Sequence, residues 1–360
     1  MTFCAIEAEK GSVCQELNKL SRTVKRERRR YLDETGFREF LVTKRKLNEK
    51  AIQTHIEMVK EAEAFLKKKG KTGDLNKATP RDLEGFVMLL MKDGRNTQEN
   101  LIALARYAYF TNNRQVVVAL LELIDGNEVL QNLSDVVKKT VGARKHKEIF
   151  EGIELPPLGT HSREKPKITK KVMERLEAKL DEETCRNVLS GGLHGPIPEE
   201  VFLPERKKFQ ESKGLDDFLK KRHEEYVSEL EEHMKNKTLY FTQEIDEEVV
   251  KYVRNTPTCQ NGVREGDVII VTKIPYMAKK YLHEKDPKKK RYYACHCSWV
   301  REAILSGLEV SPNFCYCSAG FEKRPWDIIF NQPVKADVIQ TVLKGDPICK
   351  FAIHIPKQFL

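Results

Sequence analysis

The stretch Val334-Lys-Ala-Asp-Val-Ile-Gln-Thr-Val-Leu-Lys-Gly-Asp-Pro-Ile-Cys-Lys-Phe-Ala-Ile-His-Ile355 decides the fold class of this chain. Two runs rich in β-branched residues, 334–343 and 349–355, flank a Lys-Gly-Asp-Pro turn, which is the pattern of two strands joined by a short connection. A third such run, Asp267-Val-Ile-Ile-Val-Thr272, precedes them. We therefore predict an α+β domain with a largely antiparallel sheet over residues 256–360.

Two Cys-x-Cys pairs lie between these predicted strands, at Cys295-His296-Cys297 and Cys315-Tyr316-Cys317. The aromatic residues around each pair predict strands over residues 291–297 and 313–318. Alternate residues of a strand point to the same face of the sheet, so each pair would aim both sulfurs at one place. We therefore predict a cysteine-rich site that holds a metal or carries a reactive thiol.

Zinc or another divalent transition metal is the predicted cofactor of this site, with Cys295, Cys297, Cys315 and Cys317 as candidate ligands. A set of four sulfurs is typical of a structural zinc site. A set of two or three sulfurs, completed by His296 or a carboxylate, would leave a position for a water that the metal activates. Because His296 points to the opposite strand face, we expect it to pack rather than to ligate.

A second interpretation makes one thiol a nucleophile, with Cys297 and Cys317 as the candidates and Arg301 as a cation that lowers a thiol pKa or binds a substrate carboxylate. A third interpretation treats the cysteines as small core residues, because free cysteine is among the most buried residue types.

Cys185 and His194 flank the Gly191-Gly192 turn. A buried thiol and a loop histidine explain them most simply.

Residues 36–150 show the apolar spacing of amphipathic helices and are predicted to form an all-helical domain. Within it, Thr79-Pro80-Arg-Asp82 is typical of a helix start, with a capping hydroxyl, a proline in the first position and an early carboxylate. We assign residues 1–35 to a basic N-terminal segment, 151–167 to a linker, and 168–255 to a helical region that packs on the C-terminal domain.

Composition places the chain in a broad class only. The nine cysteines are odd in number and mostly scattered through 360 residues, which predicts a reducing compartment rather than a disulfide framework. The N-terminus lacks a signal-peptide pattern, and we expect a cytoplasmic, prokaryotic protein that does not enter the membrane. The net charge of +10 combines 64 basic with 54 acidic residues and therefore identifies no partner.

The C-terminal region resembles the aminothiazoline carboxylate hydrolase-like family, which is related to the small-molecule-binding 4-vinyl reductase domain. The motifs that carry the resemblance are Cys-x-Cys-x-Trp-Val-Arg from Cys295, Phe-Cys-Tyr-Cys-Ser-Ala-Gly-Phe from Phe314, and Gly-Asp-x-x-Cys-x-Phe from Gly345. The resemblance implies a compact ligand-binding α+β domain that, in some members, opens a small ring containing sulfur and nitrogen by hydrolysis. Ser298 stands where relatives often carry a proline.

The helical half, above all residues 40–112, resembles the core-binding domain of tyrosine-type integrases. The features are a long helix that ends in a basic Gly turn, the Thr-Pro-Arg-Asp-Leu-Glu-Gly-Phe start at Thr79, and a following helix with paired aromatic residues. An integrase also needs an Arg, His-x-x-Arg and Tyr catalytic set, and the sequence downstream does not supply it. We therefore do not expect recombinase activity.

Two functions follow as hypotheses from these patterns. The first is a hydrolase that acts on a C–N or C–S bond of a small heterocyclic or amide-like compound. The alternative is a sensor whose C-terminal domain responds to a ligand or metal while the helical half contacts DNA or a protein partner. A small-molecule ligand is the expected partner, a homo-oligomer is compatible with the helical patterning, and DNA is the less favoured partner.

Overall fold

The structure is a computed structural model, and it describes residues 32–71, 73–195 and 197–360. The chain divides into two compact units. The first unit comprises the residues up to Asn127 together with Pro156–His161, and the second comprises Glu128–Leu155 and Ser162–Leu360. Most of the predicted basic segment, residues 1–31, lies outside the described residues.

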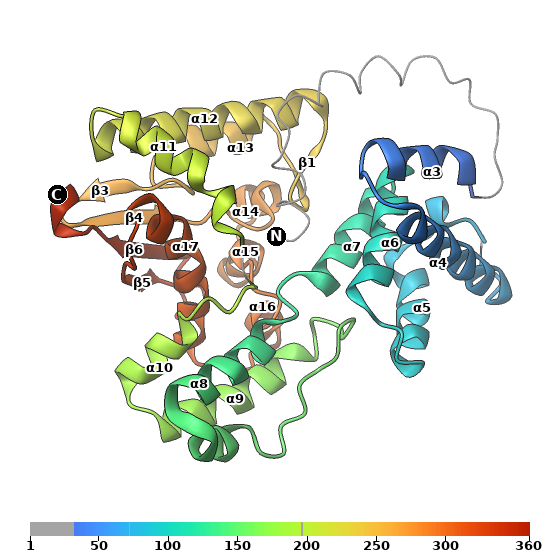
Figure 1. The fold of residues 1–360 in the computed structure, drawn as a ribbon, viewed down its shortest axis with the longest axis horizontal. Coiled ribbons are helices and arrows are strands. Elements are labelled where there is room, and N and C mark those ends of the chain that lie inside the picture. The colour runs from blue at the N-terminus through green and yellow to red at the C-terminus, as the bar shows by residue number, and fades with distance from the viewer. Residues whose placement is uncertain (1–31, 72, 196) are drawn as a thin grey trace. The chain divides into compact units, whose positions relative to one another are not determined.

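The first unit is built from helices (Figure 1). Phe37, Ile56, Phe86 and Leu104 come from four different helices and meet in one apolar core. The elements are α3 (Glu34–Thr43), α4 (Glu49–Lys68), η1 (Leu75–Lys77), α5 (Pro80–Lys92), α6 (Gln98–Phe110) and α7 (Arg114–Ile124).

The start of α5 has the predicted chemistry. The backbone N–H of Asp82 donates to the Thr79 hydroxyl, the Asp82 carboxylate accepts from the Thr79 N–H at 2.9 Å, and Pro80 occupies the first turn. These two hydrogen bonds form a capping box, which satisfies amides that have no partner inside the helix. The hydrogen bonds from Thr79, with Lys71 nearby, lower the pKa of Asp82 to about 2.

The division between the units differs from the predicted boundary at residues 150–151. The helix α8 (Val129–Phe150) belongs to the second unit, although its apolar spacing continues that of the helices before it. Part of the predicted linker packs on the first unit, where the Asn96 amide donates to the Leu158 carbonyl at 2.7 Å. Helical periodicity identifies elements, but it does not tell which core a helix joins.

The second unit begins with helices and ends with an α+β region, which confirms the predicted fold class. Gly142, at φ 83°, breaks α8 into two segments, a conformation that glycine adopts without strain. The remaining helices are α9 (Lys165–Lys179), α10 (Glu182–Leu189), η2 (Glu199–Val201), α11 (Leu203–Glu211), α12 (Leu215–Asn236), α13 (Glu247–Arg254), α14 (Ala278–His283), α15 (Pro287–Ala294), α16 (Arg301–Ser306), η3 (Pro312–Cys315), α17 (Tyr316–Ile329) and η4 (Lys357–Phe359).

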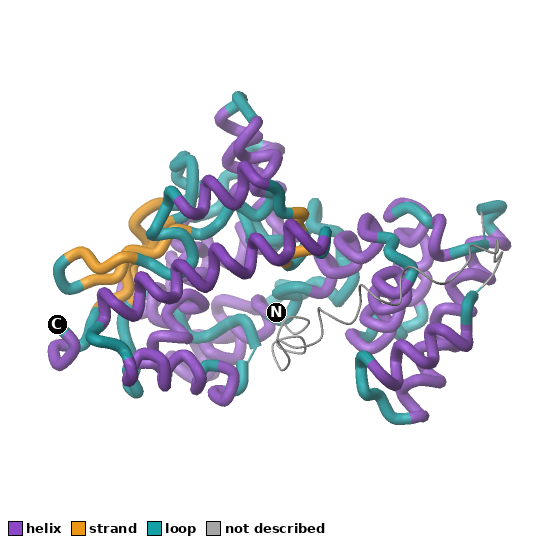
Figure 2. Tube along the Cα trace, turned by 90° about the horizontal axis from the view of Figure 1, so that it is seen from above, coloured by secondary structure: helices purple, strands orange, loops and turns teal. Residues whose placement is uncertain are grey.

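A four-stranded antiparallel sheet has the order β3-β4-β6-β5. Its strands are β3 (Val263–Glu265), β4 (Val268–Thr272), β5 (Ala336–Gln340) and β6 (Lys350–His354), while β1 (Leu239–Tyr240) and β2 (Gln243–Glu244) form a separate small pair. The strands are drawn in orange in Figure 2, where the main sheet lies among helices of the same unit. Ile269 and Ile353 of the sheet pack with Phe218 of α12 and Trp326 of α17.

The two Cys-x-Cys stretches are not strands, and this prediction was wrong. The first stretch ends α15, which Asp286 caps and Pro287 begins, and the second spans the junction of η3 and α17, where Ser311 and Pro312 begin the turn. A capping side chain followed by proline favours a helical start, and here it prevails over the β propensity of the aromatic residues. Residues two apart on a helix do not face each other, so the shared-face argument for the sulfurs fails.

No helix in the described part of the chain is both long and apolar enough to cross a membrane.

Candidate thiol site

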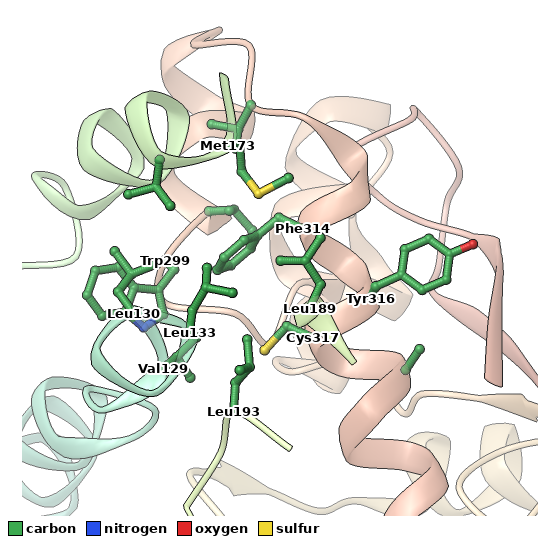
Figure 3. Packing of buried hydrophobic residues seen from close by; sticks show 14 of the residues in the cluster. Val129, Leu130, Leu133, Met173, Leu189, Leu193, Trp299, Phe314, Tyr316 and Cys317 are labelled. Carbon is green, nitrogen blue, oxygen red and sulfur yellow. The ribbon is translucent and has the colours of Figure 1, made fainter. Parts of the chain in front are cut away.

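Cys317 lies at the N-terminal end of the 14-residue helix α17 with its sulfur beside a histidine. The distance from Cys317 Sγ to His194 Nε2 is 3.4 Å, within hydrogen-bond reach for sulfur. The turn η3 runs directly into α17, and the Tyr316 N–H donates to the Asn313 and Phe314 carbonyls, so the first amide of α17 already has a backbone partner. Figure 3 shows Cys317 among apolar side chains that include Leu189 and Leu193.

His194 reaches this thiol from the turn that follows α10, and its ring packs edge-on against Phe321 with centroids 5.2 Å apart. The sequence suggested Cys185 as the cysteine nearest to this histidine along the chain. In the structure, Cys185 lies in the apolar core on α10, where burial raises its pKa to about 12. The thiol that His194 contacts is therefore Cys317, which is 123 residues away in sequence.

Cys315 precedes α17 and has a different partner from Cys317. Its sulfur lies 2.8 Å from the hydroxyl oxygen of Thr341, a fully buried residue just after β5. The two cysteines of this pair therefore point to different neighbours, as expected for residues two apart at a helical turn.

The other pair lies in the turn between α15 and α16. Cys295 is buried, and Cys297 is partly buried and accepts a hydrogen bond from the Arg301 N–H through its carbonyl at 2.9 Å. The Cys295 sulfur lies 4.0 Å from that same carbonyl oxygen. This turn therefore places a backbone carbonyl beside the Cys295 sulfur.

These four cysteines and Cys349 form a group that we call the thiol cluster. Burial raises the pKa of every thiol in it. Charge on Cys297 would further raise the pKa of Cys295, Cys315 and Cys317, so these thiols lie near enough to influence one another. All seven cysteines that the structure describes are free thiols, and burial keeps those of the cluster protonated.

A buried ion pair accompanies the thiol cluster. Lys273 Nζ lies 3.3 Å from Glu322 Oε1, and both side chains are nearly buried. Burial acts to lower the pKa of Lys273, but Glu322 and Cys349 outweigh it, so that pKa is raised and the amine stays charged. The positive charge of Lys273 in turn acts to lower the pKa of Cys317, in opposition to burial.

Metal binding by the cysteines is not supported by the geometry. Within residues 32–71, 73–195 and 197–360, no three His, Cys, Asp or Glu side chains are arranged to hold a metal ion. His296 directs Nε2 at the Ile274 carbonyl, 2.5 Å away, and packs against Tyr276. The predicted zinc site therefore stays a prediction.

Arg301 is buried at the start of α16. Its guanidinium lies over the Tyr276 ring at 4.5 Å and near the Tyr292 ring at 5.6 Å, and the Tyr292 hydroxyl donates to Glu302 at 2.8 Å. Cation–π contacts of this kind hold the arginine in the core. Its charge acts to lower the pKa of Cys295, which was not one of the two predicted nucleophiles, and burial has the larger and opposite effect.

Comparisons with protein-family models, with curated proteins and with solved structures each found no match to this chain. The resemblances to the hydrolase-like family and to the integrase domain therefore stay predictions.

The sequence named Cys317 as a candidate but did not pair it with the residues that lie beside it in the structure. His194, Lys273 and Glu322 come from a loop, the end of a strand and a helix that are far apart in the chain. No local pattern links them, and only the packing of α10 and the sheet against α17 brings them together. Cys349 is the one member of the thiol cluster outside the two Cys-x-Cys pairs. The sequence does mark it, because it lies in the Gly-Asp-x-x-Cys-x-Phe motif that leads into strand β6.

Proposed function

We propose that the second unit is a cysteine-dependent hydrolase that cleaves a C–N or C–S bond of a small organic molecule, with Cys317 as nucleophile and His194 as general base. The contact of 3.4 Å between Cys317 Sγ and His194 Nε2 carries this proposal. A thiol with an adjacent imidazole is a recurring arrangement for nucleophilic catalysis. The resemblance to a family with ring-opening hydrolases agrees with it.

The reaction balances with water as the only co-reactant. Cys317 Sγ attacks the carbonyl or imine carbon of the substrate while His194 Nε2 takes the thiol proton. His194 then gives this proton to the departing nitrogen or sulfur as its bond to carbon breaks. A carbonyl carbon leaves a thioester on Cys317 and an imine carbon leaves a thioimidate. Water then attacks this carbon, and His194 takes the water proton and passes it to the sulfur as the C–S bond breaks. The thiol is restored and the product leaves as a carboxylic acid or an amide, respectively.

Two features favour the thiolate against the effect of burial. They are the imidazole of His194 and the charge of Lys273, which acts to lower the pKa of Cys317. Burial prevails at rest, so Cys317 is a protonated thiol until the base acts. A site of this kind spares its nucleophile from oxidation between turnovers.

The first test uses p-nitrophenyl acetate, an activated ester that leaves an acetyl group on a nucleophile. We expect mass spectrometry to find the acetyl group on Cys317 of the wild-type chain and none after Cys317→Ala. His194→Ala should slow acetylation by about 10²-fold or more, the usual contribution of a general base. Cys315→Ala is the matched control, because Cys315 is equally buried but contacts Thr341, and it should react like wild type.

Acetylation of another residue at the wild-type rate in Cys317→Ala would contradict the proposal.

The bond specificity needs a second assay, in which a small thiazoline and a small amide are offered and the released thiol or amine is measured. Turnover that disappears in Cys317→Ala, with an unchanged circular dichroism spectrum, is the expected result.

A metal-responsive sensor is the second candidate. Its support is that five thiols lie near enough to affect one another's pKa values, but no three described side chains are arranged as metal ligands, so metal binding would require these thiols to move. Cysteine ligands would have to lose their protons, so binding would release protons and stabilise the fold. Metal analysis of protein purified without an affinity tag tests this function. About one metal per chain that is lost in Cys295→Ser and Cys297→Ser would support it, and metal-free protein with unchanged stability in added zinc would contradict it.

A further inference from the structure

Arg106 of the first unit is a buried cation without a carboxylate partner. It lies on α6 and is 8% exposed. Its Nη1 contacts His55 Nε2 at 2.8 Å, whereas its Nε is buried and has no hydrogen-bond partner among the described residues. Among the described residues, no Asp or Glu comes within ion-pair distance of its guanidinium. A buried charge is costly unless it is paired, so this arrangement calls for a counter-ion.

His55 orients Arg106 but does not neutralise it. Its Nδ1 lies 2.8 Å from the Ala51 carbonyl, so Nδ1 carries the proton and donates, and Nε2 accepts from Arg106. Burial, followed by the charge of Arg106, lowers the pKa of His55 and keeps the ring neutral. The role of His55 is therefore to fix the direction of the guanidinium.

A second arginine adds positive charge to this place. The Arg45 guanidinium lies over the ring of Tyr109, which is one helical turn from Arg106 on α6, and this places the two cations near each other. In agreement, the charge of Arg45 acts with burial to lower the pKa of Arg106. Arg45 is held over the rings of Phe40 at 5.3 Å and Tyr109 at 5.2 Å. Tyr109 follows Arg106 by three residues on α6 and therefore shares its face of the helix.

Among the described residues, Glu99 is an acidic residue whose charge acts on Arg106. Glu99 acts to raise the pKa of both Arg106 and His55 from a distance, without an ion pair to either. Arg95 in the same unit forms a bidentate ion pair, in which its two terminal nitrogens donate to the Glu61 carboxylate at 2.7 and 2.6 Å.

We propose that Arg106 and Arg45 form a binding site for a small oxyanion of the phosphate class, with His55 as a positioning residue. Guanidinium groups match the geometry of phosphate oxygens and bind them through charge-assisted hydrogen bonds. Because Arg106 is largely buried, the site suits a free phosphate or a terminal phosphate group on a small molecule. A phosphate in a duplex backbone carries a sugar on either side, so we do not expect it to reach an arginine that is 8% exposed.

The test measures binding of inorganic phosphate to the full chain by titration calorimetry at constant ionic strength. Arg106→Gln should weaken binding by about tenfold or more, because a hydrogen bond to a charged group is lost. Arg95→Gln is the matched control and should bind like wild type. His55→Leu should weaken binding, and His55→Gln, which keeps an acceptor for Arg106, should restore it.

Wild-type protein that does not bind phosphate, or Arg106→Gln that binds it as tightly as wild type, would overturn the assignment. If Arg106→Gln fails to fold, Arg45→Gln removes the second charge from a less buried position and should also weaken binding. A duplex DNA of mixed sequence separates the sources of phosphate. Binding of the duplex that depends on Arg106, without binding of free phosphate, would overturn the small-anion assignment.

Discussion

At the scale of single residues, the environment of Cys317 predicts an unusual response to pH. Burial raises the pKa of this thiol well above 9, so the thiolate is a minor species at neutral pH. We expect the rate of Cys317 alkylation by iodoacetamide to rise about tenfold per pH unit up to at least pH 9. Peptide mapping after timed labelling measures this rate. Because the same folded protein is compared at each pH, the limited access of iodoacetamide to the buried thiol affects all the rates equally.

Lys273 supplies the variant that tests the cause of this behaviour. Its positive charge acts to lower the pKa of Cys317, so Lys273→Met should slow alkylation at every pH below the pKa. Lys280→Met, at a lysine that contacts the Tyr293 ring instead, is the control and should leave the rate unchanged. A rate that is flat between pH 7 and 9 would show that the thiol is already ionised and would contradict the assignment.

His55 predicts a second pH dependence, this time of stability. Its pKa is lowered in the folded protein by burial, so the unfolded chain binds more protons below about pH 6.5. The contribution of His55 is therefore present above pH 6.5 and is lost as the pH falls below it. Urea unfolding of the first unit at pH 7.5 and 5.5 should show this loss, and His55→Gln should reduce it.

The control for His55 is His161→Gln, which changes the exposed histidine of the same unit. It should leave the difference between the two pH values as in wild type. Equal pH dependence in wild type and His55→Gln would assign the effect to other groups.

At the scale of elements, the start of α5 makes a measurable contribution. Thr79→Ala removes the hydroxyl that caps the helix and should lower the free energy of unfolding of the first unit by about 1 kcal/mol. Amide hydrogen exchange in the first turn of α5 should become faster. Thr54→Ala, inside α4, is the control, because its hydroxyl only bonds back to the Lys50 carbonyl and alanine favours the helix.

The secondary-structure elements also show which parts of the fold can be predicted from local sequence patterns and which cannot. The start of α5 and the strands β4, β5 and β6 follow from local patterns, since caps, turns and β-branched runs act within a few residues. In the two cysteine stretches the local signals conflict, because the aromatic residues favour strands whereas Asp286-Pro287 and Ser311-Pro312 begin helical turns, and the helical turns prevail. The contact between Cys317 and His194 had no local signal, because tertiary packing alone creates it.

At the scale of the whole molecule, the buried apolar residues form clusters that each stay within one unit. Both tryptophans, Trp299 and Trp326, belong to the second unit. Tryptophan fluorescence therefore follows the unfolding of that unit alone, whereas circular dichroism follows the helices of both units. The two signals together distinguish a molecule with two independent cores from one that unfolds as a single body.

Leu104→Ala provides this distinction. Leu104 is fully buried in the core of the first unit, and its truncation should cost that unit about 2–5 kcal/mol. We expect the early part of the circular dichroism transition in urea to move to lower concentration while the fluorescence transition stays in place. Leu176→Ala, in a core of the second unit, should move the fluorescence transition instead. A fluorescence midpoint that falls equally in both variants would mean that the two cores unfold cooperatively, and pH effects on the first unit would then extend to the thiol cluster.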